Sequence, residues 1–256
     1  MRVANTRAGA QSGRPGGAVA LPPVQHPDKA GAGDVLVGRQ EMDAMTGTAE
    51  AVLICEHVSR WFGGLQALKD VSIAIQPGEI YGLVGPNGSG KTTLVNAITG
   101  FYPPQSGRIR FGPHRLERMA PHKVAALGIA RTFQNVALFK GMSALDNILM
   151  GRHVHMRPSA LASLFYWVWA KDEEVRNREK VEEIIDLLQL QSVRHEPIET
   201  IPLGMQKRVE LARALAAEPR LLILDEPMAG MNQEEKEYMV RFILDACEAL
   251  NLSILL

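Results

Sequence analysis

Two patterns of hydrophobic and polar positions divide the chain near residue 51. Residues 1–50 contain no Phe, Trp or Tyr, are rich in Gly, Ala and Pro, and show no sustained spacing of apolar positions. Such a segment buries too little apolar surface to offset the conformational entropy lost on folding. We therefore predict a disordered N-terminal tail over 1–50 and a folded domain over 51–256.

Apolar runs after residue 51 predict strands. In VSIAI (71–75), apolar and small residues alternate, which is typical of a strand with one covered face. LLILD (221–225) is apolar up to its final Asp, as in a strand that is covered on both faces. Because such strands occur mainly in parallel sheets, the central sheet is expected to be parallel.

Helical patterns alternate with these strands. Helices are expected to begin at Lys91, after Pro121, and at Ser143, where Asp146 forms a capping pair. A longer helix is expected from about 172 to 190, with its charged residues on a solvated face. Its apolar positions are Val181, Ile184, Ile185 and Leu188. Alternating strands and helices predict an α/β fold.

Composition and charge narrow the function classes. The chain has 28 Lys plus Arg and 28 Asp plus Glu, so no basic stripe is indicated and we expect no nucleic-acid partner. Cys55 and Cys247 match no metal spacing and are interpreted as reduced thiols, and His153 and His155 as surface residues. The most apolar stretch, ALASLFYWVWA, is far shorter than the roughly 20 residues that cross a bilayer.

The motif GPNGSGKTT satisfies G-x-x-x-x-G-K-[ST] and lies between the predicted strand IYGLV and the apolar helix LVNAITG. Glycines at this spacing let backbone amides and a helix N-terminus face phosphate oxygens. Lys91 would reach the β- and γ-phosphates, and the Thr92 hydroxyl would ligate Mg²⁺. This context predicts a nucleotide-binding loop. Its candidate residues are Gly85, Pro86, Asn87, Gly88, Ser89, Gly90, Lys91, Thr92 and Thr93.

Two carboxylates follow the buried strand in LLILDEP. Asp225 would lie near the metal, and Glu226 beside the water that attacks the γ-phosphate. A solvated acidic pair at a strand end is the alternative, which the nearby phosphate motif disfavours. The pair therefore predicts hydrolysis of the nucleotide, with Lys91 and Glu226 as catalytic residues.

With these motifs the chain resembles the ATP-binding-cassette ATPases over nearly all of 52–256. RTFQN resembles their Gln loop, which makes Gln134 a catalytic residue and a Mg²⁺ ligand. IPLGMQKRVELARAL stands in place of the signature motif, 21 residues before Asp225 when counted from Gly204, and AGMNQEE resembles the D-loop. The resemblance implies a RecA-like P-loop NTPase core, an antiparallel β subdomain and a helical subdomain at about 113–200.

The same resemblance suggests an adenine contact. Phe62 lies about two dozen residues before the phosphate motif, where the family has an aromatic residue that stacks on the base. An ordinary strand aromatic is an equally good interpretation of Phe62, and Trp61 could exchange roles with it. Gly204 is the further nucleotide-binding candidate, because the signature motif touches ATP.

Segments from FGGLQALKD onward, with ARTFQNVALFKGMSALDNILMGRH, resemble the ATPases of branched-chain amino-acid and related amide or urea uptake systems. In that family ATP and Mg²⁺ bind between two ATPase subunits, which drive two transmembrane permeases. A substrate-binding protein is an indirect partner of the ATPase subunits. The resemblance therefore implies attachment to the cytoplasmic face of the inner membrane through the permeases. Residues 136–150 would contact the permeases, or would simply pack as a helix.

Two departures from the family pattern lead to further expectations. Ile201 to Met205 replace Leu-Ser-Gly-Gly-Gln, so Pro202 stands where a hydroxyl donor is usual. Losing such a charge-assisted hydrogen bond costs about 1.5–3 kcal/mol. Because this motif acts on the partner's ATP, we predict a heterodimer with unequal sites. The sequence ends at Leu256 before any switch histidine, and we expect a truncated chain with weak hydrolysis.

Two other functions fit parts of the pattern. A soluble cassette ATPase of repair or translation would carry coiled coils, zinc modules or a second cassette, and none is visible in the sequence. A nucleotide-binding regulator without hydrolysis would suit the altered signature, but Glu226 argues against it. The main prediction is therefore the ATP-binding subunit of an importer.

Overall fold

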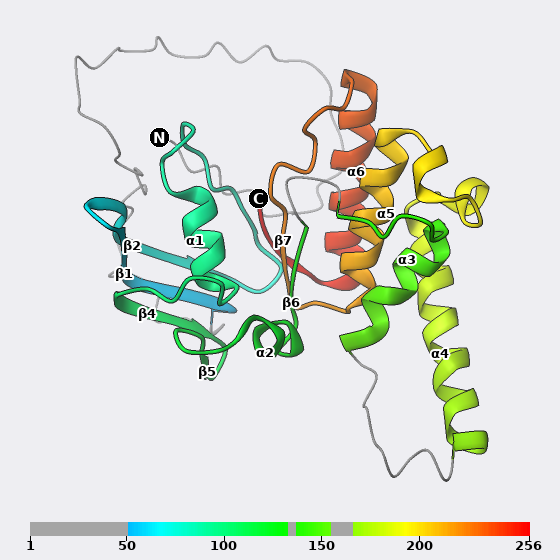
Figure 1. Cartoon of the computed structure of the whole chain (residues 1–256), viewed down its shortest axis with the longest axis horizontal. Helices are drawn as coiled ribbons and strands as arrows, with labels where there is room; N and C mark the ends of the chain where they lie inside the picture. Colours follow the sequence, from blue (N-terminus) through cyan, green and yellow to red (C-terminus); the bar gives the residue numbers. More distant parts are fainter. Residues whose placement is uncertain (1–50, 133–136, 155–165) are drawn as a thin grey trace, which may run out of the picture.

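The computed structural model describes residues 51–132, 137–154 and 166–256, without the side chains at 154 and 166–174. The tail predicted over 1–50 lies outside the described residues. Figure 1 shows a layered arrangement, in which the central strands β6 and β7 lie between α1 with its antiparallel sheet and a group formed by α3, α4, α5 and α6. This arrangement of sheets and helices agrees with the predicted α/β fold.

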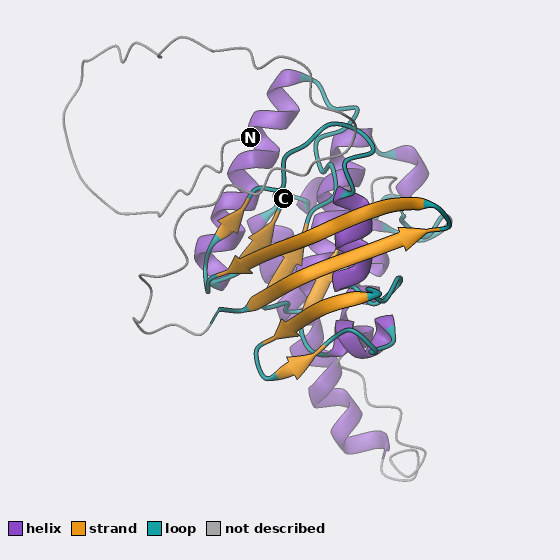
Figure 2. Cartoon of the chain, turned by 90° about the vertical axis from the view of Figure 1, so that its left-hand side faces the viewer, coloured by secondary structure: helices purple, strands orange, loops and turns teal. Residues whose placement is uncertain are grey.

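The first sheet is antiparallel and has the strand order β2-β1-β4-β5 (Figure 2). The alternation predicted for VSIAI is confirmed, since Val71, Ile73 and Ile75 are buried and the small residues between them are not. Gly63 adopts a φ of +57° in the turn between the two longest strands, a conformation that favours glycine. The strands are β1 (Leu53–Phe62), β2 (Leu65–Ile75), β4 (Ser106–Phe111) and β5 (His114–Arg115).

The second sheet has the order β3-β8-β7-β6, and every pairing in it is parallel, as predicted. In β7 the side chains of Leu221 and Ile223 belong to one hydrophobic core, whereas Leu222 and Leu224, the residue after the strand, belong to the other. The strand is therefore covered on both faces, which explains its unbroken apolar run. The strands are β3 (Ile80–Tyr81), β6 (Ile129–Arg131), β7 (Leu221–Ile223) and β8 (Ser253–Leu255).

The helices fall on both sides of this sheet. Residues of α1 join the core that contains the antiparallel sheet, and α3, α4, α5 and α6 form the other core. The helices are α1 (Lys91–Ile98), α2 (Pro121–Ala126), α3 (Ala144–Gly151), α4 (Tyr166–Leu187), α5 (Leu203–Ala216) and α6 (Gln233–Leu250). Short 3₁₀ turns are η1 (Arg152–Val154), η3 (Gln191–Val193) and η4 (Ile198–Thr200).

Local signals located the helix starts. Helices begin at Lys91 and Pro121, and Ser143 caps α3 by accepting a hydrogen bond from the backbone N–H of Asp146, as predicted. The predicted bounds of the long helix were wrong, because α4 spans Tyr166–Leu187. The chain leaves the helix where Gln189 adopts a φ of +52°. The four apolar positions predicted for it are nevertheless all buried.

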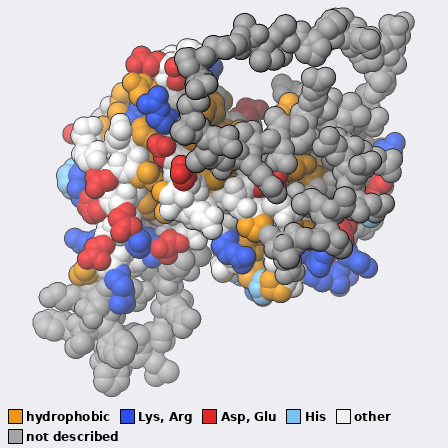
Figure 3. All heavy atoms as spheres, turned by 180° about the vertical axis from the view of Figure 1, so that it is seen from behind, with side chains coloured by type: hydrophobic (Ala, Val, Ile, Leu, Met, Phe, Trp, Pro, Cys, Tyr) orange, Lys and Arg blue, Asp and Glu red, His pale blue; other side chains and the backbone are white. Residues whose placement is uncertain are grey.

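Acidic and basic side chains are interspersed on the left-hand side of Figure 3, which is the helical side of the molecule. Within the described segments, no helix is both long enough and apolar enough to span a bilayer. Several large apolar side chains remain exposed on the opposite hairpin and the loop after α1. These are Trp61, Phe62, Leu65, Phe101 and Tyr102.

The two cysteines lie in different environments. Cys55 is buried in β1, and burial raises the pKa of its thiol to about 12. Cys247 is partly buried in α6 and its Sγ donates to the carbonyl oxygen of Leu252 at 3.1 Å. Because the thiolate is the reactive form, we expect a maleimide at pH 8 to label Cys247 slowly in the folded protein and Cys55 only after unfolding. Mass spectrometry of labelled peptides would measure this, and rapid labelling of native Cys55 would contradict it.

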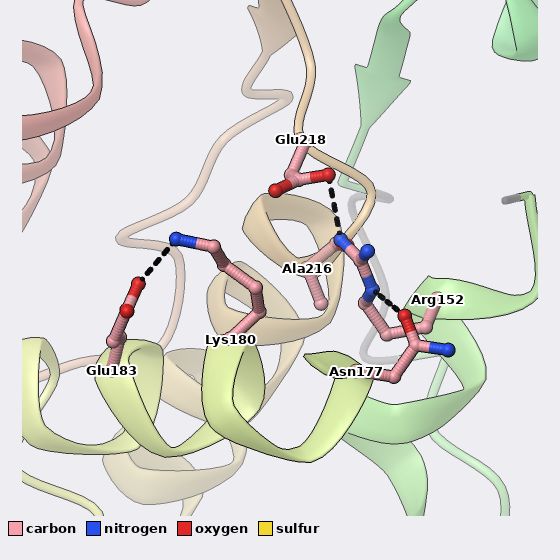
Figure 4. A network of polar contacts seen from close by, with 6 residues as sticks. All are labelled: Arg152, Asn177, Lys180, Glu183, Ala216 and Glu218. Atoms are coloured by element: carbon pink, nitrogen blue, oxygen red, sulfur yellow. Dashed lines mark hydrogen bonds and ion pairs between the residues drawn. The ribbon is translucent and has the colours of Figure 1, made fainter. Parts of the chain in front are cut away.

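A buried arginine joins three segments of the helical group (Figure 4). Arg152 donates through Nε to Asn177 of α4 at 2.9 Å and through Nη1 to the carbonyl oxygen of Ala216 at 2.9 Å. Nη1 also lies 2.9 Å from a carboxylate oxygen of Glu218. The arginine thus connects the end of α3, the middle of α4 and the end of α5.

We expect Arg152→Ala to lower the free energy of unfolding by about 2 kcal/mol, because it leaves buried acceptors without their donor. Urea denaturation followed by circular dichroism would measure the change. The neighbouring Lys180→Ala is the control, because the ion pair of Lys180 with Glu183 is exposed and its loss should barely move the midpoint. Equal losses in the two variants would contradict the role of the buried arginine.

Candidate functional site

The phosphate loop, residues 85–93, connects β3 to α1. Gly90 caps α1 with a φ of +95° and without a side-chain hydrogen bond. A Cβ atom at this position would collide with the carbonyl oxygen of Ala67 in β2. The loop can therefore lie this close to β2 only because residue 90 is glycine. The first-turn amides of α1 have no intrahelical acceptors, and they leave a positive helix end at the loop.

The lysine of the loop lies along the loop itself. Lys91 Nζ donates to the carbonyl oxygens of Gly85 at 2.5 Å and Pro86 at 3.0 Å. The ammonium therefore reaches from the end of the loop back to its beginning. Ser89 Oγ is buried and has no hydrogen-bond partner among the described residues, and a Cβ at Gly85 would come within 2.6 Å of it. Closely approaching glycines, a buried hydroxyl and a lysine suit the oxygens of a phosphate.

The acidic pair stands at the end of β7. The Asp225 side chain is 16% exposed, and its Oδ2 accepts a hydrogen bond from Arg131 Nη2 at 2.8 Å. Glu226 is exposed and adopts a φ of +49°, a left-handed conformation that costs a non-glycine residue roughly 1–3 kcal/mol. This turn changes the direction of the chain at the strand end. Strain of this kind often accompanies functional positions.

The two halves of the candidate site lie at the same edge of the parallel sheet, namely the edge formed by the carboxyl ends of its strands. The phosphate loop follows β3 and the acidic pair follows β7, and both strands run in the same direction. Arg131 joins them, because its Nη1 donates to Asn96 of α1 at 2.6 Å while Nη2 pairs with Asp225. The structure therefore places Asp225 beside the helix that carries Lys91. Ligands of open α/β sheets bind at this edge.

Sequence reasoning missed Arg131 as part of the site. It is the last residue of β6 and lies three residues before Gln134 in the sequence. Gln134 itself lies outside the described residues. A cation at the end of a strand was visible in RTFQN, but its partner depends on β6 lying next to β7, which no local pattern indicates.

The predicted adenine contact lies at the tip of the first hairpin. Phe62 is paired with Leu65, two residues before Ala67, whose carbonyl lies against Gly90. The hairpin therefore brings Phe62 to the side of the molecule that carries the phosphate loop. The residue is 40% exposed, and its ring packs edge-on against Tyr102 at 5.4 Å between centroids. Tyr102 is a second aromatic that the sequence did not single out.

Trp61 occupies the other side of the same strand end. Its backbone N–H donates to the side chain of Gln105 at 3.0 Å, and its carbonyl oxygen accepts from the same side chain at 2.9 Å. Successive residues of a strand point to opposite faces, so only one of Trp61 and Phe62 can stack on a given base. Both residues are exposed, and the choice between them stays a prediction.

The signature segment starts α5. Pro202 is the residue before Leu203, the first of the helix, and has an extended ψ of 152°. Gly204 lies in the first turn, where a Cβ would come within 2.5 Å of a carboxylate oxygen of Glu235. Glu235 and Asn232 form the capping box that starts α6. The glycine thus permits close packing between the starts of two helices.

The segment 137–150 contains both buried and exposed apolar residues. Ala144 and Ile148 are buried in the helical core, while Phe139 and Met150 are exposed. Arg213 of α5 donates to the carbonyl oxygen of Ala137 at 2.6 Å. Packing in the helical core therefore accounts for the buried residues of α3. The exposed Phe139 and Met150 are available for a permease contact, which stays a prediction.

Comparisons with known proteins agree on one family. A family model described as ABC transporter matches residues 68–229. The chain is 36% identical, over 195 residues and 76% of each chain, to the high-affinity branched-chain amino acid transport ATP-binding protein BraF of Pseudomonas aeruginosa. It is 37% identical, over 180 residues, to a probable branched-chain amino acid transport ATP-binding protein, LivG, of Methanocaldococcus jannaschii, covering 70% of this chain and 69% of the relative.

Solved structures resemble the fold as well. An ATP-binding cassette of an ABC transporter in its ADP conformation matches with a TM-score of 0.69 and 34% identity, over 80% of each chain. A nucleotide-free ATP-binding cassette matches with a TM-score of 0.67 and 34% identity, also over 80% of each chain.

Proposed function

This chain belongs to the ABC transporter family, and we propose that it is the ATP-binding subunit of an importer that takes up branched-chain amino acids or related amides. One observation carries the proposal. The phosphate loop and the acidic end of β7 stand at one sheet edge and are connected through Asn96, Arg131 and Asp225. The solute class rests on the names of relatives such as BraF and LivG.

Within this proposal each side chain has a chemical task. Lys91 and the loop amides bind the β- and γ-phosphates of ATP, and Glu226 accepts a proton from the attacking water. Thr92 and Asp225 supply an exposed hydroxyl and a carboxylate, the oxygen ligands that Mg²⁺ prefers, and Gln134 would complete the set. Magnesium, when bound, neutralises phosphate charge. Phe62 or Trp61 would stack on adenine.

The proposed partners follow from the altered signature. A second ATPase subunit would face this one, and a heterodimer is favoured because Pro202 offers no hydroxyl to the partner's ATP. Two permease subunits would hold the pair at the cytoplasmic face of the inner membrane, and a substrate-binding protein would deliver the solute. The first turn of α5 still presents backbone amides and a positive helix end toward an anion.

The proposal is tested by capturing the tagged chain from solubilised membranes and identifying the proteins that accompany it. We expect two permeases, a second ATPase subunit and a substrate-binding protein that binds an aliphatic amino acid or an amide. The matched control is capture of a Lys91→Ala chain, which retains the folded surfaces. Recovery of ribosomes or DNA in place of permeases would support a soluble ATPase of repair or translation instead.

A further inference from the structure

An arginine stands beside the proposed metal ligand and has not been given a function. Arg131 is 10% exposed at its side chain and is the last residue of β6. The backbone beyond it is held to the neighbouring strand by the Thr132 N–H, which donates to the Ile223 carbonyl oxygen at 2.9 Å. Its position relative to β7 is therefore set by the sheet.

The guanidinium connects the proposed metal ligand Asp225 to α1, the helix that carries the proposed ligand Thr92. Its Nη1 is 2.6 Å from Asn96 Oδ1, and its Nη2 is 2.8 Å from Asp225 Oδ2. Asn96 lies one helical turn after Thr92, and residues four apart share a face of a helix. The contacts thus extend from the side of α1 that carries Thr92 to the carboxylate at the end of β7.

We propose that Arg131 is a positioning residue that holds one carboxylate oxygen of Asp225 and leaves the other for the magnesium of bound ATP; this rests on the proposed function. Oδ1 accepts no hydrogen bond from any residue that the structure describes. Asn96 fixes the orientation of the guanidinium, whose planar fork bonds to both partners at once.

An arginine in this place could instead compete with the cation for Asp225. Its burial argues against that role. Removing the guanidinium from Asp225 would leave a nearly buried positive charge without its carboxylate, which is costly. A carboxylate has two oxygens and can serve both neighbours, as metal-ligating carboxylates that accept hydrogen bonds commonly do. The two roles predict opposite effects of removing Arg131.

The test measures how strongly magnesium increases the affinity for a fluorescent ATP analogue, by titrating the full chain in Mg²⁺ and in EDTA. We expect Arg131→Ala to lower this enhancement about tenfold while the affinity in EDTA changes less than about twofold. Arg131→Lys, which keeps the charge but not the fork, should lie between wild type and Arg131→Ala. Arg115→Ala removes an exposed arginine of β5 and should match wild type.

Other results would overturn the inference. A larger magnesium enhancement in Arg131→Ala would show competition, and equal losses with and without magnesium would show a merely structural role. An unchanged enhancement would show that Asp225 does not need the arginine. If wild type bound the analogue equally with and without magnesium, the proposed function would fail, and this inference with it.

Discussion

Lys91→Ala is expected to weaken ATP binding about 100-fold, because charge-assisted hydrogen bonds to phosphate are worth about 1.5–3 kcal/mol each. In the structure Lys91 Nζ already lies within the loop, on the carbonyl oxygens of Gly85 and Pro86. When ATP binds, its phosphate oxygens would replace these carbonyl oxygens as acceptors of the hydrogen bonds from Lys91 Nζ. Isothermal titration calorimetry with ATP and Mg²⁺ would measure the loss.

The matched control for this change is Lys123→Ala. Lys123 is an exposed lysine of α2, outside the loop, so its removal takes away the same charge without touching the site. Both variants should unfold at the same urea concentration as wild type. The two carbonyl oxygens that accept hydrogen bonds from Lys91 can accept them from water instead. An unchanged ATP affinity of Lys91→Ala would overturn the nucleotide site and with it the proposed function.

Local chemistry explains which elements the sequence could predict. The Ser143 cap, the start of α1 at Lys91 and the alternation in β2 depend on neighbours along the chain, and each was correct. The end of the long helix was missed because Gln189 leaves the helix through a positive φ that its residue type does not indicate. Apolar residues that keep the helical spacing beyond such a turn cannot be distinguished by sequence from residues inside the helix.

The candidate site shows the same division. The loop and the acidic pair are contiguous motifs, so their residues could be named from the sequence. The contact of Arg131 with Asp225 requires the β6–β7 pairing, and the closeness of Gly204 to Glu235 requires the start of α6 to meet the start of α5. Tyr102 packs on Phe62 from a loop forty residues away in sequence. Tertiary contacts of this kind leave no periodic signal.

Pro202 has separate consequences for the fold of this chain and for the ATP that the partner subunit would hold. The proline ends the extended segment before α5, and Gln206 N–H donates to its carbonyl oxygen at 3.0 Å, so the helix begins normally without a capping side chain. The altered motif therefore does not disturb this chain's own fold. Its effect would fall on the ATP that the partner subunit holds, whereas Lys91 and Glu226 would act with the partner's motif.

Glu226→Gln is expected to lower ATP hydrolysis about 1,000-fold at this subunit's site, within the 10²–10⁴ range that a general base contributes. Glutamine has the same length and pays the same backbone cost at a φ of +49°, so the turn after β7 should persist. ATP affinity should stay within about twofold, because Lys91 and the loop amides are untouched. Phosphate release and calorimetry would measure rate and affinity. Glu248→Gln, at the exposed far end of α6, is the control.

In the assembled transporter the same variant tests the heterodimer. We expect Pro202 to weaken the site completed by this chain's signature segment, so the site that contains Glu226 should carry most of the turnover. Glu226→Gln in this subunit alone should then remove well over half of the total ATPase rate, while the equivalent change in the partner removes the smaller share. Equal losses from the two changes would mean that a missing hydroxyl at Pro202 does not distinguish the sites, because the first-turn amides of α5 alone stabilise the γ-phosphate.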